Sequence, residues 1–176
     1  MHLFGPQHVI DMTNPLSKSL QGKYFLGETG MVPLGGGKFA WAALVNPAHS
    51  GTNLFLDIFT VSNLSDAVMT AHIWFCLNVP GSGQLSAHVT PANLAVLPQP
   101  LPRGQIVSES TAGPQMDGKR ATTRLVPSNS TVAAEKYGHW ILGPDKAVVL
   151  TLKGSGNDSG EANVSFGWWE EPLHSY

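Results

Sequence analysis

Short apolar runs separated by turn-forming residues are the feature of this sequence that most constrains its fold. No segment keeps a helical period over three turns, whereas clusters of glycine, proline, asparagine and serine separate the apolar runs along the chain. Many short strands with regular turn signals are typical of an all-β sandwich or barrel. The candidate strands are 23–26, 38–45, 53–62, 68–78, 105–110, 122–126, 131–135, 147–153 and 163–169. We therefore expect an all-β fold, namely a two-sheet antiparallel β-sandwich of jelly-roll type with about eight strands.

The chain length and a proline-rich stretch define the expected domain organisation. With 176 residues the chain corresponds to one domain. We expect an N-terminal arm over 1–21, the β-sandwich domain over 22–171 and a C-terminal tail over 172–176. The stretch 90–104 contains four prolines, which cannot donate to a strand ladder, so we interpret it as a crossover between the two sheets.

The first 21 residues follow neither a helical nor a strand period. Pro6 and Pro15 are expected to break any helix there. Two interpretations remain open: the arm lies on its own domain, or it docks on a neighbouring subunit by strand addition.

Two of the predicted strands are apolar on both faces. In 68–78, Met69, Ala71, Ile73, Phe75 and Leu77 share one face, and the opposite face carries Trp74 and Cys76. In 53–62, Leu54, Leu56 and Ile58 share one face, and Phe55, Asp57, Phe59 and Val61 share the other. The second face must be covered either by a loop or arm of the same chain or by another subunit.

Charge and hydropathy exclude several classes of partner. Charged residues make up 12% of the chain, against about 25% in an ordinary soluble domain, and the net charge is −2. The ten basic residues are scattered, which argues against nucleic acid as a partner. No apolar run is long enough for a transmembrane helix, and the N-terminus lacks the features of a secretory signal. We expect cytoplasmic synthesis, with localisation beyond that left open, including release to the cell or spore surface.

The sequence contains no strong catalytic or metal-binding signature. The seven histidines show neither HxH nor HxxxH spacing, and no GxSxG nucleophile motif is present. Cys76 lies in a Trp-Phe-Cys-Leu run, where cysteine is more often a small buried hydrophobe than a nucleophile. We therefore predict no enzyme activity, no cofactor and no bound metal.

The last predicted strand, 163–169, carries the clearest candidate for a binding residue at the surface. Trp168 is in phase with Val164 and Phe166 and should lie in the core, so Trp169 should point outward or into a contact. An outward tryptophan either stacks on a sugar ring or anchors a protein interface, where tryptophan is enriched. We favour the interface because apolar second faces recur elsewhere in the chain.

Four strings carry a resemblance to a known family: AWAALVNPAHSGTNLFLDIFTVSNLSD (40–66), HVTPANLAVLPQP (88–100), RLVPSNSTV (124–132) and VSFGWWEE (164–171). Over about 22–171 the chain resembles a family of short bacterial proteins, found mainly in spore-forming Gram-positive bacteria, that has no assigned activity. The resemblance implies a free-standing all-β domain and transfers no catalytic residue. In architecture alone it is similar to the jelly-roll subunits of spore appendages and other extracellular fibres. Those subunits typically carry cysteines in their N-terminal connector, and this arm has none.

The leading functional expectation is a structural subunit that assembles with itself into a homo-oligomer, fibre or surface layer. Low charge weakens the repulsion between copies, and apolar second faces and a non-repeating arm offer contacts. The expected interface residues are Phe4, Val9, Ile10, Trp74, Cys76 and Trp169. The alternative is a carbohydrate-binding module that uses Tyr137, Trp140 and Trp169, and a third hypothesis is an enzyme on a β scaffold.

Overall fold

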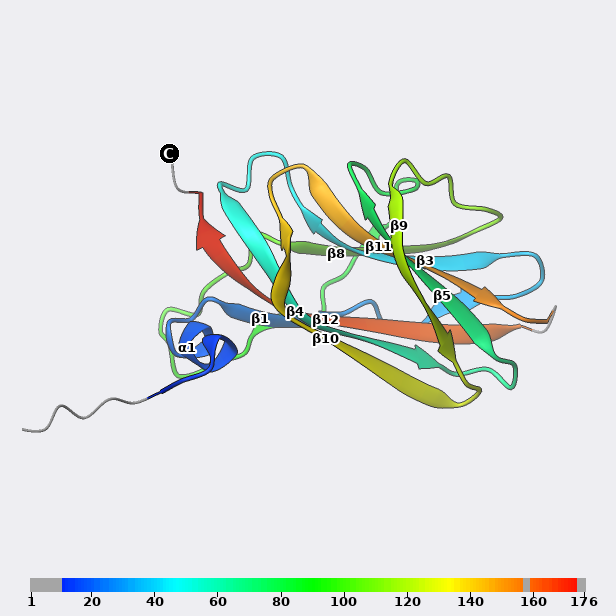
Figure 1. Ribbon diagram of the computed structural model, residues 1–176, viewed down its shortest axis with the longest axis horizontal. Helices are drawn as coiled ribbons and strands as arrows, with labels where there is room; N and C mark the ends of the chain where they lie inside the picture. Colours follow the sequence, from blue (N-terminus) through cyan, green and yellow to red (C-terminus); the bar gives the residue numbers. More distant parts are fainter. Residues whose placement is uncertain (1–10, 157–158, 174–176) are drawn as a thin grey trace, which may run out of the picture.

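The computed structural model describes residues 11–156 and 159–173 and consists of two antiparallel sheets packed face to face (Figure 1). The lower sheet in Figure 1, sheet I, has the order β10 (Ser130–Leu142), β4 (Thr52–Asn63), β12 (Gly160–Pro172), β1 (Tyr24–Glu28) and β7 (Val89–Pro91), with β2 (Val32–Leu34) also paired to β12. The upper sheet, sheet II, has the order β6 (Gln84–Leu85), β8 (Gln105–Thr111), β3 (Phe39–Asn46), β11 (Lys146–Gly154), β5 (Met69–Cys76) and β9 (Lys119–Val126). The predicted two-sheet antiparallel sandwich is confirmed.

The main core lies between the two sheets and follows the period of two that strands impose on their side chains. Val148, Leu150 and Leu152 of β11 face Val164, Phe166 and Trp168 of β12 across the sandwich, and all six are almost fully buried. Phe25 of β1 joins them, with its ring centroid 6.0 Å from that of Trp168. The prediction that Trp168 belongs to the core is therefore confirmed.

All nine predicted strands form, and three further strands were missed. The missed strands β2, β6 and β7 have only two or three residues each, and β2 and β7 contain Pro33 and Pro91. Runs this short show no alternation, and proline lowers the strand signal further. The proline-rich stretch does cross between the sheets, because β7 pairs in sheet I and the next strand, β8, pairs in sheet II.

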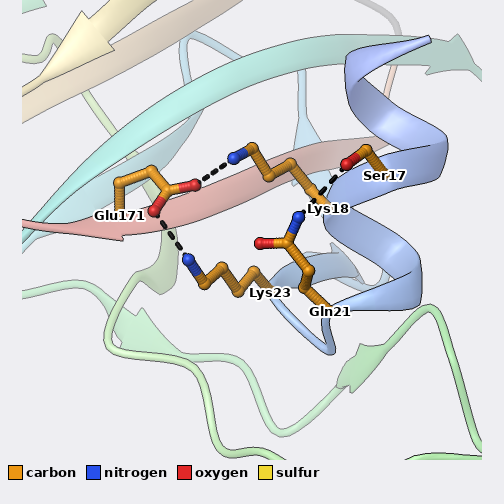
Figure 2. A network of polar contacts seen from close by, with 5 residues as sticks. All are labelled: Ser17, Lys18, Gln21, Lys23 and Glu171. Atoms are coloured by element: carbon orange, nitrogen blue, oxygen red, sulfur yellow. Dashed lines mark hydrogen bonds and ion pairs between the residues drawn. The ribbon is translucent and has the colours of Figure 1, made fainter. Parts of the chain in front are cut away.

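The prediction that prolines prevent a helix in the N-terminal arm is wrong for its second half. The helix α1 spans Asn14–Leu20 and has Pro15 in its first turn. A proline is favourable there, since the N–H groups of the first turn have no partner within the helix. Lys18 and Lys23 both form ion pairs with Glu171 of β12, the second at 2.8 Å, and Gln21 donates to Ser17 (Figure 2). The described part of the arm therefore lies on its own domain, at one end of sheet I.

The outer face of sheet II is covered by the chain's own loops, which decides between the two alternatives left open for this face. Trp41, Cys76 and Val149 form a second buried cluster there, and Val79 and Met116 from the flanking loops pack against it. Gly83 approaches so closely that a Cβ at this position would lie 2.7 Å from the Trp41 ring. No second subunit is needed to bury this face of β5.

Candidate functional site

Opposite the core, the outer face of sheet I begins at the α1 end with a row of three aromatic residues. Phe55, Trp169 and Tyr24 lie side by side on β4, β12 and β1, because the strand register pairs Phe55 with Trp169 and Trp169 with Tyr24. The Phe55 and Trp169 rings stack, with centroids 5.4 Å apart and planes 2° from parallel. The three rings form an apolar band across the sheet.

A β-bulge in β10 covers this band. Glu135 pairs with Ile58 and Trp140 pairs with Leu56, so residues 136–139 lie opposite Asp57 alone. Gly138, with a φ of 73°, passes directly over the Trp169 ring, and a Cβ on Gly138 would overlap that ring. Trp169 thus points to the outer face of sheet I but is only 4% exposed.

A hydrogen bond separates the aromatic band from the surface beyond it. The Tyr24 hydroxyl donates to Asp57 Oδ2 at 2.8 Å. Burial and the neighbouring carboxylate raise the pKa of Tyr24 well above its ordinary value, so the phenol stays protonated at neutral pH.

Beyond this bond the sheet face opens into a shallow apolar groove of about 530 Å³. Its central row runs Ile58, Gly167, Leu26, Thr90 across β4, β12, β1 and β7. Gly167 forms the floor, because Ile58 and Leu26 stand on either side of a residue without a side chain. Leu26 is 44% exposed and is the groove's most prominent apolar side chain.

The groove has a polar rim and offers little for catalysis. The next row along the strands is Thr60, Ser165 and Glu28, and the segment 87–90 closes the side at β7. Glu28 and His88 are the ionisable residues that line it, and the Glu28 carboxylate accepts a hydrogen bond of 3.2 Å from Asn163. An apolar floor with a polar rim is the composition of a surface that binds apolar side chains.

The groove residues were not predicted, and the expected face of Ile58 is wrong. The alternation in 53–62 put Ile58 on the same face as Leu54 and Leu56, which are indeed in the core. In the structure the pairing of β4 with β12 shifts by one residue at Asp57, so Asp57 and Ile58 both lie on the outer face. Phe59 and Val61, expected on the second face with Phe55, therefore lie in the core. No signal in the sequence marks this bulge.

The residues expected at an interface lie at several different places. Phe4, Val9 and Ile10 fall outside the described residues. Trp74 is half-buried on sheet II, where its indole donates to Thr151 Oγ1 at 3.2 Å and the Arg120 guanidinium lies 5.8 Å from the ring centroid. Both interactions of Trp74 are made within the chain. A role for Trp74 in a contact between subunits stays a prediction.

Cys76 is buried beneath the loops of sheet II, with 4% of its surface exposed. Burial and Asp117 raise the pKa of its thiol to about 12, so the nucleophilic thiolate is absent at neutral pH. The interpretation of Cys76 as a small buried hydrophobe is therefore confirmed by its surroundings.

The three aromatic residues of the carbohydrate hypothesis do not form one exposed platform. Trp140 packs against Phe59 and Phe75, with the Lys136 ammonium 4.4 Å from its ring centroid, and Trp169 is covered by Gly138. Tyr137 is 60% exposed and is the one ring of the three that is open to a ligand. Carbohydrate binding stays a prediction.

The described residues, 11–156 and 159–173, hold neither a cluster of metal-ligating side chains nor a membrane-spanning helix. They contain no group of three or more His, Cys, Asp or Glu side chains placed to hold a metal ion. Within the same ranges no helix has the length and apolar composition that a bilayer crossing needs.

Fold and surface together define an antiparallel β-sandwich with an apolar groove on an open sheet face. The chain belongs to the family of unknown function DUF6143, whose model matches residues 4–175. No curated protein matches it. The resemblance to a family without assigned activity is thereby confirmed, and an origin in spore-forming Gram-positive bacteria stays a prediction.

Proposed function

We propose that this protein is a structural subunit that associates with copies of itself through the outer face of sheet I. The observation that carries the proposal is the groove around Leu26, an exposed apolar side chain between Ile58 and the segment 87–90. Exposed apolar surface rimmed by polar residues marks an interaction site. A net charge of −2 on 176 residues leaves little repulsion between approaching copies.

The strand edges argue for contact through side chains rather than by strand addition. The outermost strand β10 of sheet I is interrupted by its bulge, and β9 of sheet II carries Lys119, Arg120 and Arg124. At the opposite edges β7 and β6 have three and two residues, and β2 contains Pro33. Bulges, charges, prolines and short strands all hinder pairing with another chain.

The proposal predicts that a charge at Leu26 weakens association. Leu26→Lys in the full chain is expected to weaken the contact about tenfold or more, because burying a leucine stabilises by about 1.5–3 kcal/mol. The molar mass is measured by light scattering after size-exclusion chromatography over a concentration series. Circular dichroism checks that the variant keeps its fold.

The matched control is Leu125→Lys on β9, since Leu125 is 67% exposed and lies on the other sheet. It is expected to associate like the unmodified chain. If Leu26→Lys associates as well as this control does, the groove is not the interface.

A further inference from the structure

The shape of the groove indicates what kind of surface fits into it. Leu26 and Ile58 rise on either side of Gly167, so the apolar floor is recessed between two side chains. A flat sheet face from another copy would rest on these two side chains and leave the floor empty. A single extended segment can instead place its side chains in the recess, with Thr60, Ser165 and Glu28 along its path.

This chain has a segment of matching chemistry ahead of α1. The sequence of residues 1–10 is MHLFGPQHVI, which contains Phe4, Val9 and Ile10 and no Asp, Glu, Lys or Arg. Apolar side chains without a charge between them suit an apolar floor whose ionisable lining, among the described residues, consists of Glu28 and His88. Pro6 restricts the backbone toward extended conformations, which lowers the entropy lost on docking.

The anchoring of α1 sets where this segment starts. Lys18 of the helix and Lys23 just after it pair with Glu171 at the end of β12 (Figure 2). Asn93 donates to the Ser19 carbonyl at 3.1 Å. The chain enters α1 from the lower left of Figure 1, on the side away from both sheets. Ten extended residues reach about 33–36 Å from this point, which is enough to reach a copy lying beside the molecule.

We propose that residues 1–10 of one copy occupy the groove of a second copy, with Phe4, Val9 and Ile10 against Leu26, Ile58 and Gly167. This inference rests on the proposed function and names the partner of its interface. Each copy then both gives an arm and receives one.

A mixing experiment with two full-length variants tests the exchange. The arm variant carries Phe4→Ser, Val9→Ser and Ile10→Ser and keeps its groove, and the groove variant Leu26→Lys keeps its arm. Each alone is expected to stay monomeric, since neither has both an intact arm and an intact groove. When mixed they are expected to form a heterodimer, because the arm of the groove variant fits the groove of the arm variant. Light scattering after size-exclusion chromatography reports the mass. The mixed pair should dissociate more readily than unmodified copies that exchange both arms, because it keeps one arm–groove contact of the two.

The remaining outcomes separate the inference from the proposed function. If the arm variant alone associates like the unmodified chain, residues 1–10 do not occupy the groove, and the inference is overturned while the proposed function stands. If both variants are monomeric and mixing restores nothing, exchange between copies is overturned and docking within one copy is favoured. If the unmodified chain is monomeric throughout, both proposals fail. Gln7→Ser is the control within the arm and should associate normally.

Discussion

At the scale of single residues, Gly138 and Gly30 share a φ of 73° but have opposite surroundings. Apart from Gly30 and its two chain neighbours, no atom of residues 11–156 or 159–173 lies within 4 Å of a Cβ built on Gly30, whereas a Cβ on Gly138 would overlap the Trp169 ring. An alanine at either position must adopt the left-handed region, which costs about 1 kcal/mol. Only at Gly138 must the aromatic band also move.

We therefore predict that Gly138→Ala lowers the free energy of unfolding by about 2–4 kcal/mol and Gly30→Ala by about 1 kcal/mol. Urea denaturation followed by tryptophan fluorescence measures both. Because both glycines have the same φ, the difference between the two decreases in unfolding free energy reports the packing of β10 on Trp169. Equal decreases would mean that the bulge does not pack tightly against that ring.

The face of the sheet on which a side chain lies could be predicted from the sequence where the strand alternates without interruption. Trp168 was assigned to the core from its alternation with Val164 and Phe166, and it is fully buried. The same alternation failed at Ile58, because the bulge at Asp57 shifts the phase of β4 in mid-strand. Trp169 was correctly expected on the outer side, but Gly138 of β10, which covers it, is distant in sequence, so this cover could not be predicted from β12 alone.

At the scale of elements, the connector between β7 and β8 depends on one buried carboxylate. Glu170 of β12 is 7% exposed and accepts hydrogen bonds from the backbone N–H groups of Arg103 and Gly104 at 2.8–3.0 Å. The Trp168 indole N–H donates to the same carboxylate at 3.1 Å. These bonds fix the end of the crossover against sheet I, just before β8 begins in sheet II.

Glu170→Ala is expected to lower the free energy of unfolding by about 3 kcal/mol, since it leaves three donors without their acceptor and each unmet buried group costs about 1–3 kcal/mol. Glu161→Ala provides the control, because Glu161 lies on the same strand and is exposed. Its effect should stay within about 0.5 kcal/mol. Chemical denaturation of both variants measures the free energy of unfolding. If Glu170→Ala lowers it no more than Glu161→Ala does, the Glu170 carboxylate does not hold the connector in place.

Long strands with clear alternation could be predicted from the sequence, and short or proline-bearing elements could not. Pro15 was interpreted as a helix breaker, although in the first turn of α1 it is tolerated without loss of a hydrogen bond. Strands β2 and β6 are strands because they pair with β12 and β8, respectively. Such pairing is a tertiary effect that cannot be predicted from the few residues of each strand.

At the scale of the whole molecule, the two outer faces of the sandwich differ in how they are covered. The outer face of sheet II buries Trp41 and Cys76 under its own loops. The outer face of sheet I is covered by β10 at the aromatic band, and the described part of the chain leaves it open at Leu26 and Ile58. The groove residues come from four strands far apart in sequence, so their meeting follows from register and could not be predicted from any one segment.

If the open face of sheet I is an interface between copies, the unmodified chain must associate in solution. Sedimentation equilibrium of the unmodified full chain over a wide concentration range measures this association. We predict a weight-average mass that rises with concentration above the 18.7 kDa of one chain, with little dependence on salt because the contact is apolar. A mass that stays at 18.7 kDa at every concentration would contradict the claim.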